Sequence, residues 1–504
     1  MSPEIRMARK RAESLDLDLP RPTEAVQAVP FSYGILVGIT LFAAALRLYK
    51  LGAWSFWGDE MFTIRDAQIA VSTPGLHALS FTLTGVALRI FGISEWSARL
   101  VSALIGIGTI PVLYVLVRRI FGSRVALGAA LLLAISPWHL YWSQNARFYT
   151  ALLLFYTVAL FLFFLAFERD RPLLLGLSLL FAGLALLERL TALLFMPVVV
   201  TYLALLYLVP GLGWLGIPRP SGLRPRNLAL LFVPTFLGGL YMAVPQIMAW
   251  PQWLEAFGRI NNNPFWIVAG VAYYVRVPIL VMGLAGLAYL LLQERPHLQR
   301  AGLLLGASAL VPLALIAALS LVHYTANRYV FISLTSWVVL ASVAVVALFE
   351  QVRGRWSSRA VASSLLVLGL LAVLVLEPLS ENLLYYRYQN GNRDDWRGAF
   401  AYVQARMQPG DRVISGHSLL GDYYLDQETI DIYGLTLSDL EALDSRTWLV
   451  ADMNVPERRP GMYRWIVENA QLMGIFDVHV RARNFMLRVY LFEPGEPVRP
   501  VYVR

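Results

Sequence analysis

Long runs of apolar residues recur through most of this chain, and they constrain its fold more than any other feature. A run of about 20 apolar residues crosses the hydrocarbon core of a bilayer as a helix, which satisfies its own backbone hydrogen bonds there. The runs begin near Phe31, Ala98, Val125, Phe148, Leu173, Leu190, Leu228, Tyr273, Ala301, Tyr329 and Val361. With 58% hydrophobic and 15% charged residues, the composition is also typical of such a protein. The sequence therefore predicts a polytopic α-helical membrane protein with about 11 transmembrane helices.

Basic residues gather in alternate connections between these runs. The net charge is +9, and the even-numbered connections carry Arg118, Arg119, Arg124, Arg169, Arg171, Arg219, Arg224, Arg226, Arg295, Arg300, Arg353, Arg355 and Arg359. Cytoplasmic loops carry an excess of basic residues, so this pattern indicates membrane orientation rather than nucleic-acid binding. We expect a multi-pass protein of the cell (inner) membrane with a cytoplasmic N-terminus. Everything after about Glu377 would then lie outside the cytoplasm.

The expected organisation has three parts. Residues 1–30 are proline-containing and precede an apolar run without a clear cleavage site, so we expect a flexible cytoplasmic N-terminus before an uncleaved first span. Residues 31–380 form the transmembrane domain, with a long first outer loop at 50–97. Residues 381–504 carry shorter apolar runs and more charge, and predict a small extracytoplasmic α/β domain. Its predicted elements are a helix at Trp396–Met407 and strands at Arg412–Ser415, Thr447–Ala451 and Met486–Phe492.

Four charged residues are expected on the outer face of the membrane at one depth. Asp59 and Glu60 lie in the first outer loop, whereas Arg147 and Arg328 lie in later outer connections. A carboxylate can accept a proton from an attacking hydroxyl, and a guanidinium can hold a phosphate with two parallel hydrogen bonds. Because neighbouring helical residues point about 100° apart, one carboxylate is expected to act and the other to orient the loop.

Simpler interpretations of these residues stay open. Asp59 and Glu60 could stabilise the N-terminus of a short helix, and the two arginines could be interfacial anchors that reach lipid headgroups. Tyr149 and Tyr329 could belong to the aromatic belt, and His77 could satisfy a local hydrogen bond. The chain has no cysteine and no HxxH or HExxH spacing, so we predict no metal site.

Several motifs, taken in order, resemble one family of enzymes. The Asp-Glu pair of the first outer loop is similar to that of C-type-fold membrane glycosyltransferases. FGISEWSARLVSALIGIGTIPVLYVLVRRIFG and SQNARFYTALLLFY resemble the bacterial branch of the dolichyl-phosphate-mannose protein mannosyltransferase family, which includes aminoarabinose transferases acting on lipid A. ANRYVFISL resembles that family's Arg-Tyr motif, and DDWRGAFAYVQARMQPGDRVI the opening of its extracytoplasmic domain.

The resemblance implies a fold, a reaction and a set of site residues. It implies the C-type glycosyltransferase fold and transfer of a hexose or pentose, with inversion, from a polyprenyl-phosphate donor to a hydroxyl of a lipid, protein or polysaccharide. Asp59 is implied as the base, with Glu60 beside it. The donor phosphate would be bound by Gln144, Asn145, Arg147, Tyr149, Arg328 and Tyr329. Acceptor contact or support of the loop would fall to His77, Arg99 and Glu188.

The resemblance leaves three questions open. No cofactor is implied with certainty, and a divalent cation is left open. At the outer end of the fifth span, relatives often carry Lys or His, whereas this chain has Glu188-Arg189. This difference leaves the acceptor specificity open. The competing functions are a membrane transporter or flippase of polyprenyl-linked or other lipid substrates, and a non-catalytic scaffold.

Overall fold

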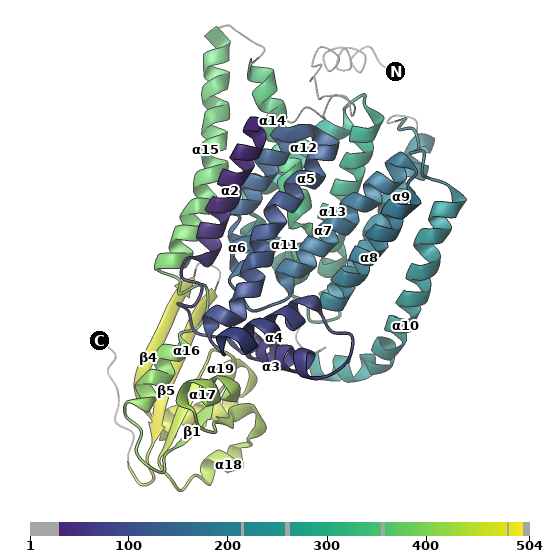
Figure 1. Cartoon of the computed structure of the whole chain (residues 1–504). Coiled ribbons are helices and arrows are strands. Elements are labelled where there is room, and N and C mark those ends of the chain that lie inside the picture. Colours follow the sequence, from purple (N-terminus) through teal and green to yellow (C-terminus); the bar gives the residue numbers. More distant parts are fainter. Residues whose placement is uncertain (1–29, 213–215, 258–262, 354–357, 481–482, 497–504) are drawn as a thin grey trace.

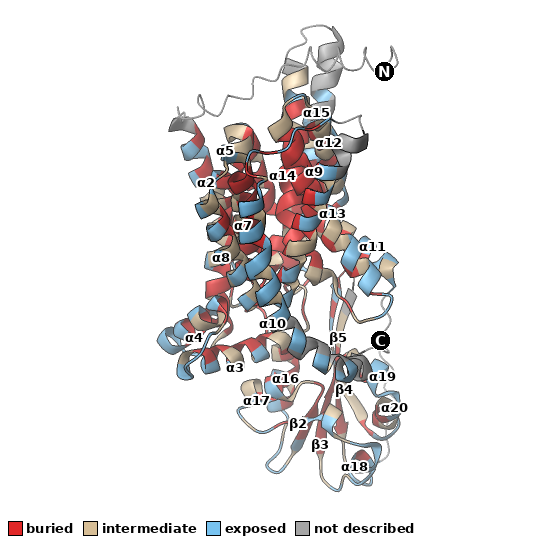
Figure 2. Ribbon diagram, turned by 90° about the vertical axis from the view of Figure 1, so that its right-hand side faces the viewer, coloured by how far each residue is buried: buried red, intermediate tan, exposed pale blue. Residues whose placement is uncertain are grey.

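The computed structural model describes residues 30–212, 216–257, 263–353, 358–480 and 483–496. Apart from Pro30, the expected flexible N-terminus at residues 1–30 lies outside the described residues. Figure 1 shows a bundle of long helices with a smaller part, built around a β-sheet, at one end. Buried residues concentrate inside the bundle, whereas many large apolar side chains on its outer helices are exposed, as expected for helices that face lipid (Figure 2).

A helix lies at each predicted apolar run of the described chain. The bundle comprises α2 (Pro30–Leu48), α5 (Glu95–Ile135), α7 (Tyr149–Arg169), α8 (Pro172–Glu188), α9 (Phe195–Leu212), α10 (Pro225–Phe257), α11 (Pro264–Val275), α12 (Val277–Leu291), α13 (Pro296–Leu319), α14 (Leu334–Arg353) and α15 (Ser358–Arg387). Among the described residues, six helices are long and apolar enough to span a membrane, or seven if the bent pair α11–α12 is one span. The chain is a multi-pass membrane protein, and the count of eleven spans stays a prediction.

The element α5 is a helical hairpin that contains two of the predicted spans. Gly122 interrupts it with φ +84°, a conformation that glycine adopts without steric cost. Beside this turn, Arg118 hydrogen-bonds Tyr33 at the start of α2. At the other end of α5, the carbonyl of Ile135 accepts a hydrogen bond from Asn382 in the last helix of the bundle (2.8 Å). The chain therefore runs from the loop side of the bundle to Gly122 and back.

The eighth predicted span is broken into two helices. The axes of α11 and α12 differ by 93°, and the break falls at Arg276, whose φ is +79°. The run predicted to start near Tyr273 thus begins in α11, and α12 is the straight segment that follows. One face of α11 is buried through Ile267, Val271 and Val275, whereas Phe265 and Trp266 are exposed.

The first outer loop lies between the bundle and the sheet. It contains α3 (Gly58–Ser72) and α4 (Leu79–Phe91), which pack against each other (Figure 1). The short helix α6 (Pro137–Ser143) and the 3₁₀ segments η1 (Leu190–Leu194) and η2 (Asn327–Ser333) complete the outer connections of the bundle.

The C-terminal part contains a five-stranded mixed sheet of order β2-β1-β3-β5-β4. The strands are β1 (Arg412–Ser415), β2 (Ile430–Asp431), β3 (Thr447–Ala451), β4 (Gln471–Val480) and β5 (Arg483–Phe492). β1 is parallel to β2 and β3, whereas β5 is antiparallel to β3 and β4. The helices are α16 (Trp396–Gln404), α17 (Ser418–Leu425), η3 (Ile432–Gly434), α18 (Leu437–Glu441), α19 (Asn454–Arg458) and α20 (Pro460–Asn469).

The sheet and the first outer loop share one hydrophobic core. Phe56, Ile64 and Leu88 of the loop pack in the same cluster as Trp396 and Phe400 of α16. The predicted strands β1 and β3 have the expected bounds, and β5 contains the predicted strand at Met486–Phe492. The helix α15 continues past the boundary expected after residue 380, to Arg387. The C-terminal part therefore packs directly on the loop that carries Asp59 and Glu60.

Candidate active site

Glu60 is completely buried in the first turn of α3 and is held by three groups. Arg99 donates two parallel hydrogen bonds to it, from Nε to Oε1 (2.8 Å) and from Nη2 to Oε2 (2.7 Å). Arg393 donates from Nη1 to Oε2 (3.2 Å), and the backbone N–H of Ala146 donates to Oε1 (2.8 Å). Burial raises the pKa of Glu60, but the two guanidiniums lower it by more than burial raises it. The pKa of Glu60 therefore lies below its usual value. Glu60 is therefore a carboxylate anchor rather than an accessible base.

Asp59 has a different environment, because its carboxylate is 27% exposed. Its Oδ2 lies 3.2 Å from Arg328 Nη1 and 3.6 Å from Arg147 Nη2. The structure thus brings together three of the four charged residues that the sequence placed on one face, and turns the fourth, Glu60, away into the protein. Of the two adjacent carboxylates, Asp59 is the one that a substrate can reach.

Arg147 is anchored, whereas Arg328 is not. Nη1 of Arg147 donates to the backbone carbonyl of Asp59 (2.7 Å) and to Thr63 Oγ1 (2.9 Å). Arg328 donates from Nη1 to Asp59 Oδ2 (3.2 Å), and its side chain is 28% exposed. The Nε atoms of both arginines are buried without a hydrogen-bond partner among the described residues. The two guanidiniums therefore retain donor capacity that the fold does not use.

Aromatic rings and a further arginine lie beside Arg147. Arg147 and Arg189 both lie over the ring of Phe148, at 4.8 and 5.3 Å from its centroid. Tyr149 is buried and packs on Trp142, with 3.9 Å between ring centroids. Tyr329 is partly buried against the core of the bundle. Arg189, at the position where the sequence departs from its relatives, thus shares the ring of Phe148 with Arg147.

The two amides of the QNAR motif hold the scaffold together. Gln144 donates from Nε2 to the carbonyls of Arg47 (3.0 Å) and Tyr49 (2.7 Å), and its Oε1 accepts from Tyr385 (3.0 Å). Asn145 accepts from Trp57 Nε1 (2.8 Å) and donates to the carbonyl of Tyr141 (2.5 Å). Both amides are fully buried, so neither is free to bind the donor phosphate as the resemblance implied.

Of the three residues expected to support the loop or meet the acceptor, two have a clear place. Arg99 binds Glu60 and also donates to the carbonyls of Leu51, Trp54 and Ser55, which fixes the chain before α3. Glu188 accepts from Ser80 N (3.0 Å) and from Ser80 Oγ, so its carboxylate caps the N-terminus of α4. His77 is bonded to the carbonyl of Thr73 (3.1 Å) at the far end of α3. Arg99 and Glu188 therefore support the loop.

The helix-capping interpretation of Asp59 and Glu60 does not fit the geometry. The N-cap residue of α3 is Trp57, and no side chain caps the helix. Both carboxylates instead form ion pairs with arginines from other segments. Their favourable position in the first turn is thus secondary to those contacts.

A divalent cation does not fit this set of side chains. Hard cations are bound by several oxygen ligands. Asp59 offers one carboxylate beside two guanidiniums, and both oxygens of Glu60 are occupied. Across the described residues, no group of three His, Cys, Asp or Glu side chains could hold a metal ion. The divalent cation that the resemblance left open therefore gains no support from the groups around Asp59.

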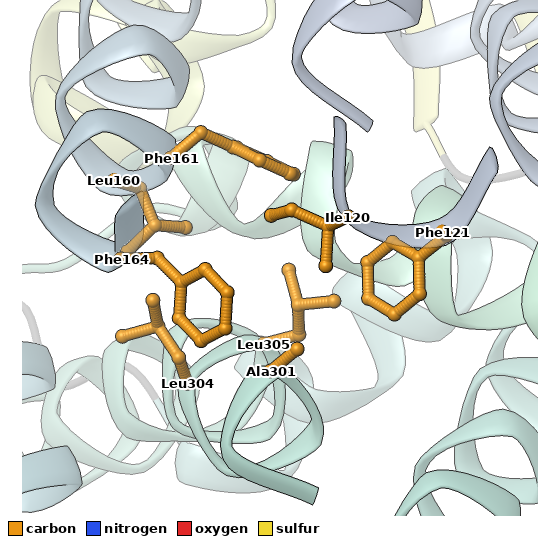
Figure 3. Close-up of a pocket in the computed structure, with 8 residues that line it drawn as sticks. All are labelled: Ile120, Phe121, Leu160, Phe161, Phe164, Ala301, Leu304 and Leu305. Carbon is orange, nitrogen blue, oxygen red and sulfur yellow. The ribbon is translucent and has the colours of Figure 1, made fainter. Parts of the chain in front are cut away.

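A separate apolar cavity lies near the opposite end of the bundle. Figure 3 shows that it is lined by side chains of α5, α7 and α13: Ile120, Phe121, Leu160, Phe161, Phe164, Ala301, Leu304 and Leu305. Ile120 and Phe121 directly precede the turn at Gly122, far along α5 from the outer loop. With no polar side chain in its lining, this cavity cannot perform acid–base or phosphate chemistry.

The side chains around Glu60 include one that the sequence analysis missed. Arg393 is 2% exposed and directly precedes the quoted motif that starts at Asp394. Its partner Glu60 is 333 residues away in the chain, so no local spacing could reveal the pair. The available signal was chemical, because a buried carboxylate needs cationic or hydrogen-bonding partners.

Comparison with known proteins supports this reading of the fold. Residues 79–212 match the family described as dolichyl-phosphate-mannose-protein mannosyltransferase. Among curated proteins, an uncharacterized protein of Aquifex aeolicus (strain VF5) is 29% identical over 157 residues, which is 30% of this chain and 30% of that protein. The resemblance that the motifs indicated is confirmed over the matched segment.

Solved structures extend the likeness to almost the whole chain. ArnT from Cupriavidus metallidurans, in the apo state, aligns with a TM-score of 0.55 at 15% identity and covers 91% of this chain and 98% of ArnT. ArnT bound to undecaprenyl phosphate aligns with a TM-score of 0.54 at 14% identity, covering 92% and 98%. The Archaeoglobus fulgidus oligosaccharyltransferase in complex with Zn and sulfate gives 0.53 at 14% identity, covering 90% and 72%. The chain therefore has the fold of these membrane glycosyltransferases.

Proposed function

We propose that this relative of the mannosyltransferase family is an inverting glycosyltransferase that moves a sugar from a polyprenyl-phosphate donor to an acceptor hydroxyl. The single observation that carries the proposal is the partly exposed Asp59 carboxylate between Arg147 and Arg328. It combines a proton acceptor with two phosphate-binding groups at one end of a membrane bundle. The same fold is seen in ArnT, which has been solved with undecaprenyl phosphate bound.

The arginines suit a donor phosphate better than they suit Asp59. The contacts of 3.2 and 3.6 Å to Asp59 are longer than typical charge-assisted hydrogen bonds of about 2.7–2.9 Å. A phosphate offers several strong acceptor oxygens to the remaining donors of both guanidiniums. On donor binding we expect Arg328 to turn from Asp59 to the phosphate, because its 3.2 Å contact with that carboxylate is one that a phosphate oxygen can replace. Arg147 would add Nη2 while Nη1 keeps its contacts within α3.

This exchange prepares the reaction. The acceptor oxygen attacks the anomeric carbon as the bond from that carbon to the phosphate oxygen breaks, and the configuration inverts. The bonding electrons leave with the polyprenyl phosphate, whose charge Arg147 and Arg328 stabilise. The acceptor proton passes to Asp59, which donor binding has released from its ion pairs. Glu60 takes no proton, because Arg99 and Arg393 occupy it.

We infer that the reaction takes place on the extracytoplasmic face of the inner membrane. The site lies at the loop end of the bundle, whereas Arg118 and Arg124 flank the turn of α5 at the opposite end. The excess of arginine in the connections at that opposite end supports a cytoplasmic position for it. The C-terminal α/β part, packed on the first outer loop, would then be extracytoplasmic.

The transporter or flippase alternative is less well supported. Transporters place ionisable residues near the middle of the bilayer, between repeated halves. Here the partly exposed Asp59 and its arginines lie in outer connections, and the structural likenesses above are to glycosyltransferases. A lipid acceptor, a protein and a polysaccharide are all compatible with an open carboxylate, so the acceptor class is left to experiment.

A binding and transfer experiment tests the proposal. The lipid that co-purifies with the protein is identified by mass spectrometry, and the protein in nanodiscs is incubated with synthetic polyprenyl-phosphate hexoses and pentoses together with lipid, peptide and polysaccharide acceptors. We expect bound polyprenyl phosphate and, for one sugar, release of polyprenyl phosphate with inverted product. In a parallel assay in proteoliposomes, movement of the intact polyprenyl-phosphate sugar between leaflets without any sugar release would instead identify a flippase.

A further inference from the structure

The connection between α15 and α16 contains an unusual turn. Asn390, Gly391 and Asn392 follow one another with φ of +46°, +63° and +55°. Only glycine adopts this region freely, and asparagine is among the few other residues that tolerate it. The turn lies directly against the first outer loop, because a Cβ on Gly391 would lie 2.6 Å from Cδ1 of Trp54. Its conformation is therefore specified by both the sequence and the contact.

The turn delivers the guanidinium of Arg393 into the protein. Nε donates to the carbonyl of Gly391 (3.3 Å), within the turn itself. Nη1 donates to Glu60 Oε2 (3.2 Å), and Nη2 donates to the carbonyl of Gln144 (3.2 Å). One buried side chain thus connects three segments that are distant in the chain: the turn, the start of α3 and the loop between α6 and α7.

Two of these segments, the start of α3 and the loop between α6 and α7, carry residues proposed to act in the reaction. Glu60 is adjacent to Asp59, and Gln144 lies three residues before Arg147. Arg147 in turn holds the backbone carbonyl of Asp59 (2.7 Å). Arg393 therefore fixes the spacing between the residue proposed as base and a residue proposed to bind the donor phosphate.

Neutralising Glu60 does not explain Arg393. Arg99 already donates two parallel hydrogen bonds to that carboxylate, and both side chains are fully buried. A second buried cation is costly to desolvate unless its hydrogen bonds are satisfied. The three separate acceptors of Arg393 satisfy that condition and use the planar fork of a guanidinium, which a lysine cannot reproduce.

We propose that Arg393 is a positioning residue for glycosyl transfer and that the Asn390–Asn392 turn sets its place, so that the C-terminal part of the chain completes the active site. This inference rests on the function proposed above. It predicts that the rate of the chemical step, rather than donor affinity, depends on the turn, because Arg147 and Arg328 bind the phosphate directly.

The test compares two matched pairs of variants. Arg393→Met removes the guanidinium, and Arg446→Met is its control, since Arg446 pairs with Asp411 (2.7 Å) and Glu493 (2.9 Å) within the C-terminal part. Gly391→Ala moves the turn without deleting a functional group. Its control is Gly410→Ala, which has the same type of backbone strain (φ +93°) but open space around the added methyl group.

Each variant, in nanodiscs, is assayed for turnover of the best synthetic polyprenyl-phosphate sugar and for the Kd of undecaprenyl phosphate. A small displacement of reacting groups can cost about 10²-fold in rate, so we expect a loss of kcat of about 10²-fold for Arg393→Met and Gly391→Ala. The Kd values of these two variants should stay close to that of the wild type. Both kcat and Kd of the two control variants should also stay close to the wild-type values. Arg393→Lys, which keeps the charge without the fork, should recover only part of the rate.

Hydrogen exchange at residues 58–63 provides a readout independent of activity. We expect faster exchange there in Arg393→Met and Gly391→Ala and unchanged exchange in the two controls. Unchanged kcat in folded Arg393→Met, a loss confined to donor Kd, or full activity of Arg393→Lys would overturn the positioning role. If the wild-type protein transfers no sugar, the proposed function fails, and the exchange experiment still decides whether Arg393 holds the start of α3.

Discussion

Replacing Glu60 by Gln should destabilise the protein severely. The substitution removes the negative charge between Arg99 and Arg393, whose side chains are 0% and 2% exposed. Gln can still accept from the N–H of Ala146, but its amide nitrogen then points a donor at guanidinium donors. Removing one partner of a buried ion pair typically costs about 3–5 kcal/mol. Because Glu60 is fully buried, we expect the free energy of unfolding to fall by an amount in this range, without reduction by solvent screening.

The assay is the free energy of unfolding in mixed micelles, followed by tryptophan fluorescence. The matched control is Glu493→Gln, which removes a carboxylate that is 42% exposed and bonded to Arg446 (2.9 Å). Exposed pairs contribute about 0–1 kcal/mol, so this control should change little. A loss for Glu60→Gln as small as that of Glu493→Gln would refute the view that Glu60 anchors the loop.

The remaining predictions concern acid stability, donor binding and topology. The pKa of Glu60 is lower in the folded protein than its usual value of 4.5, so its stabilisation is present above that value and is lost as the pH falls through the folded pKa. The stability difference between wild type and Glu60→Gln should therefore shrink on acidification, and a difference that grows would contradict this assignment. Arg328→Ala should weaken undecaprenyl phosphate binding by about 2 kcal/mol, or about 30-fold in Kd, without loss of stability. Arg147→Ala should weaken donor binding and also lower the stability of the protein, because Arg147 holds Asp59 and Thr63. An unchanged Kd in both variants would show that the two arginines are only membrane-interface anchors. A reporter fused after Arg504 should be active only outside the cytoplasm, and cytoplasmic activity would reject the proposed orientation.

The positions of the helices could be predicted because the bilayer fixes the length of an apolar run. The breaks within runs could not be predicted as readily. The turn at Gly122 and the 93° bend at Arg276 depend on backbone conformations with positive φ, which apolar composition does not report. Composition also could not separate α11, with its exposed Phe265 and Trp266, from the span that follows it.

The site shows the same division. Asp59, Arg147 and Arg328 were expected to meet, because charges at the ends of spans share one membrane face, and their side chains do lie together. The buried partners were out of reach, since Glu60 is 39 residues from Arg99 and 333 from Arg393. The amides of Gln144 and Asn145 were expected at the phosphate. Gln144 instead donates to the carbonyl of Tyr49, and Asn145 accepts from the side chain of Trp57. Sequence patterns indicate which residue types lie on a face, whereas tertiary packing decides which of them stay accessible.

The most direct test of the account is single-turnover transfer by Asp59→Asn in nanodiscs with a synthetic donor. Asn keeps the shape and hydrogen-bonding capacity of Asp59 but cannot accept the acceptor proton, so transfer should fall by about 10²–10⁴. The Kd of the donor should stay the same or decrease, because a negative charge beside Arg147 and Arg328 is removed. The control is Asp66→Asn, on the same helix, whose side chain is 38% exposed and pairs with the neighbouring Arg65. Wild-type rates in Asp59→Asn would contradict the proposed role of Asp59 as the base, and with it the mechanism.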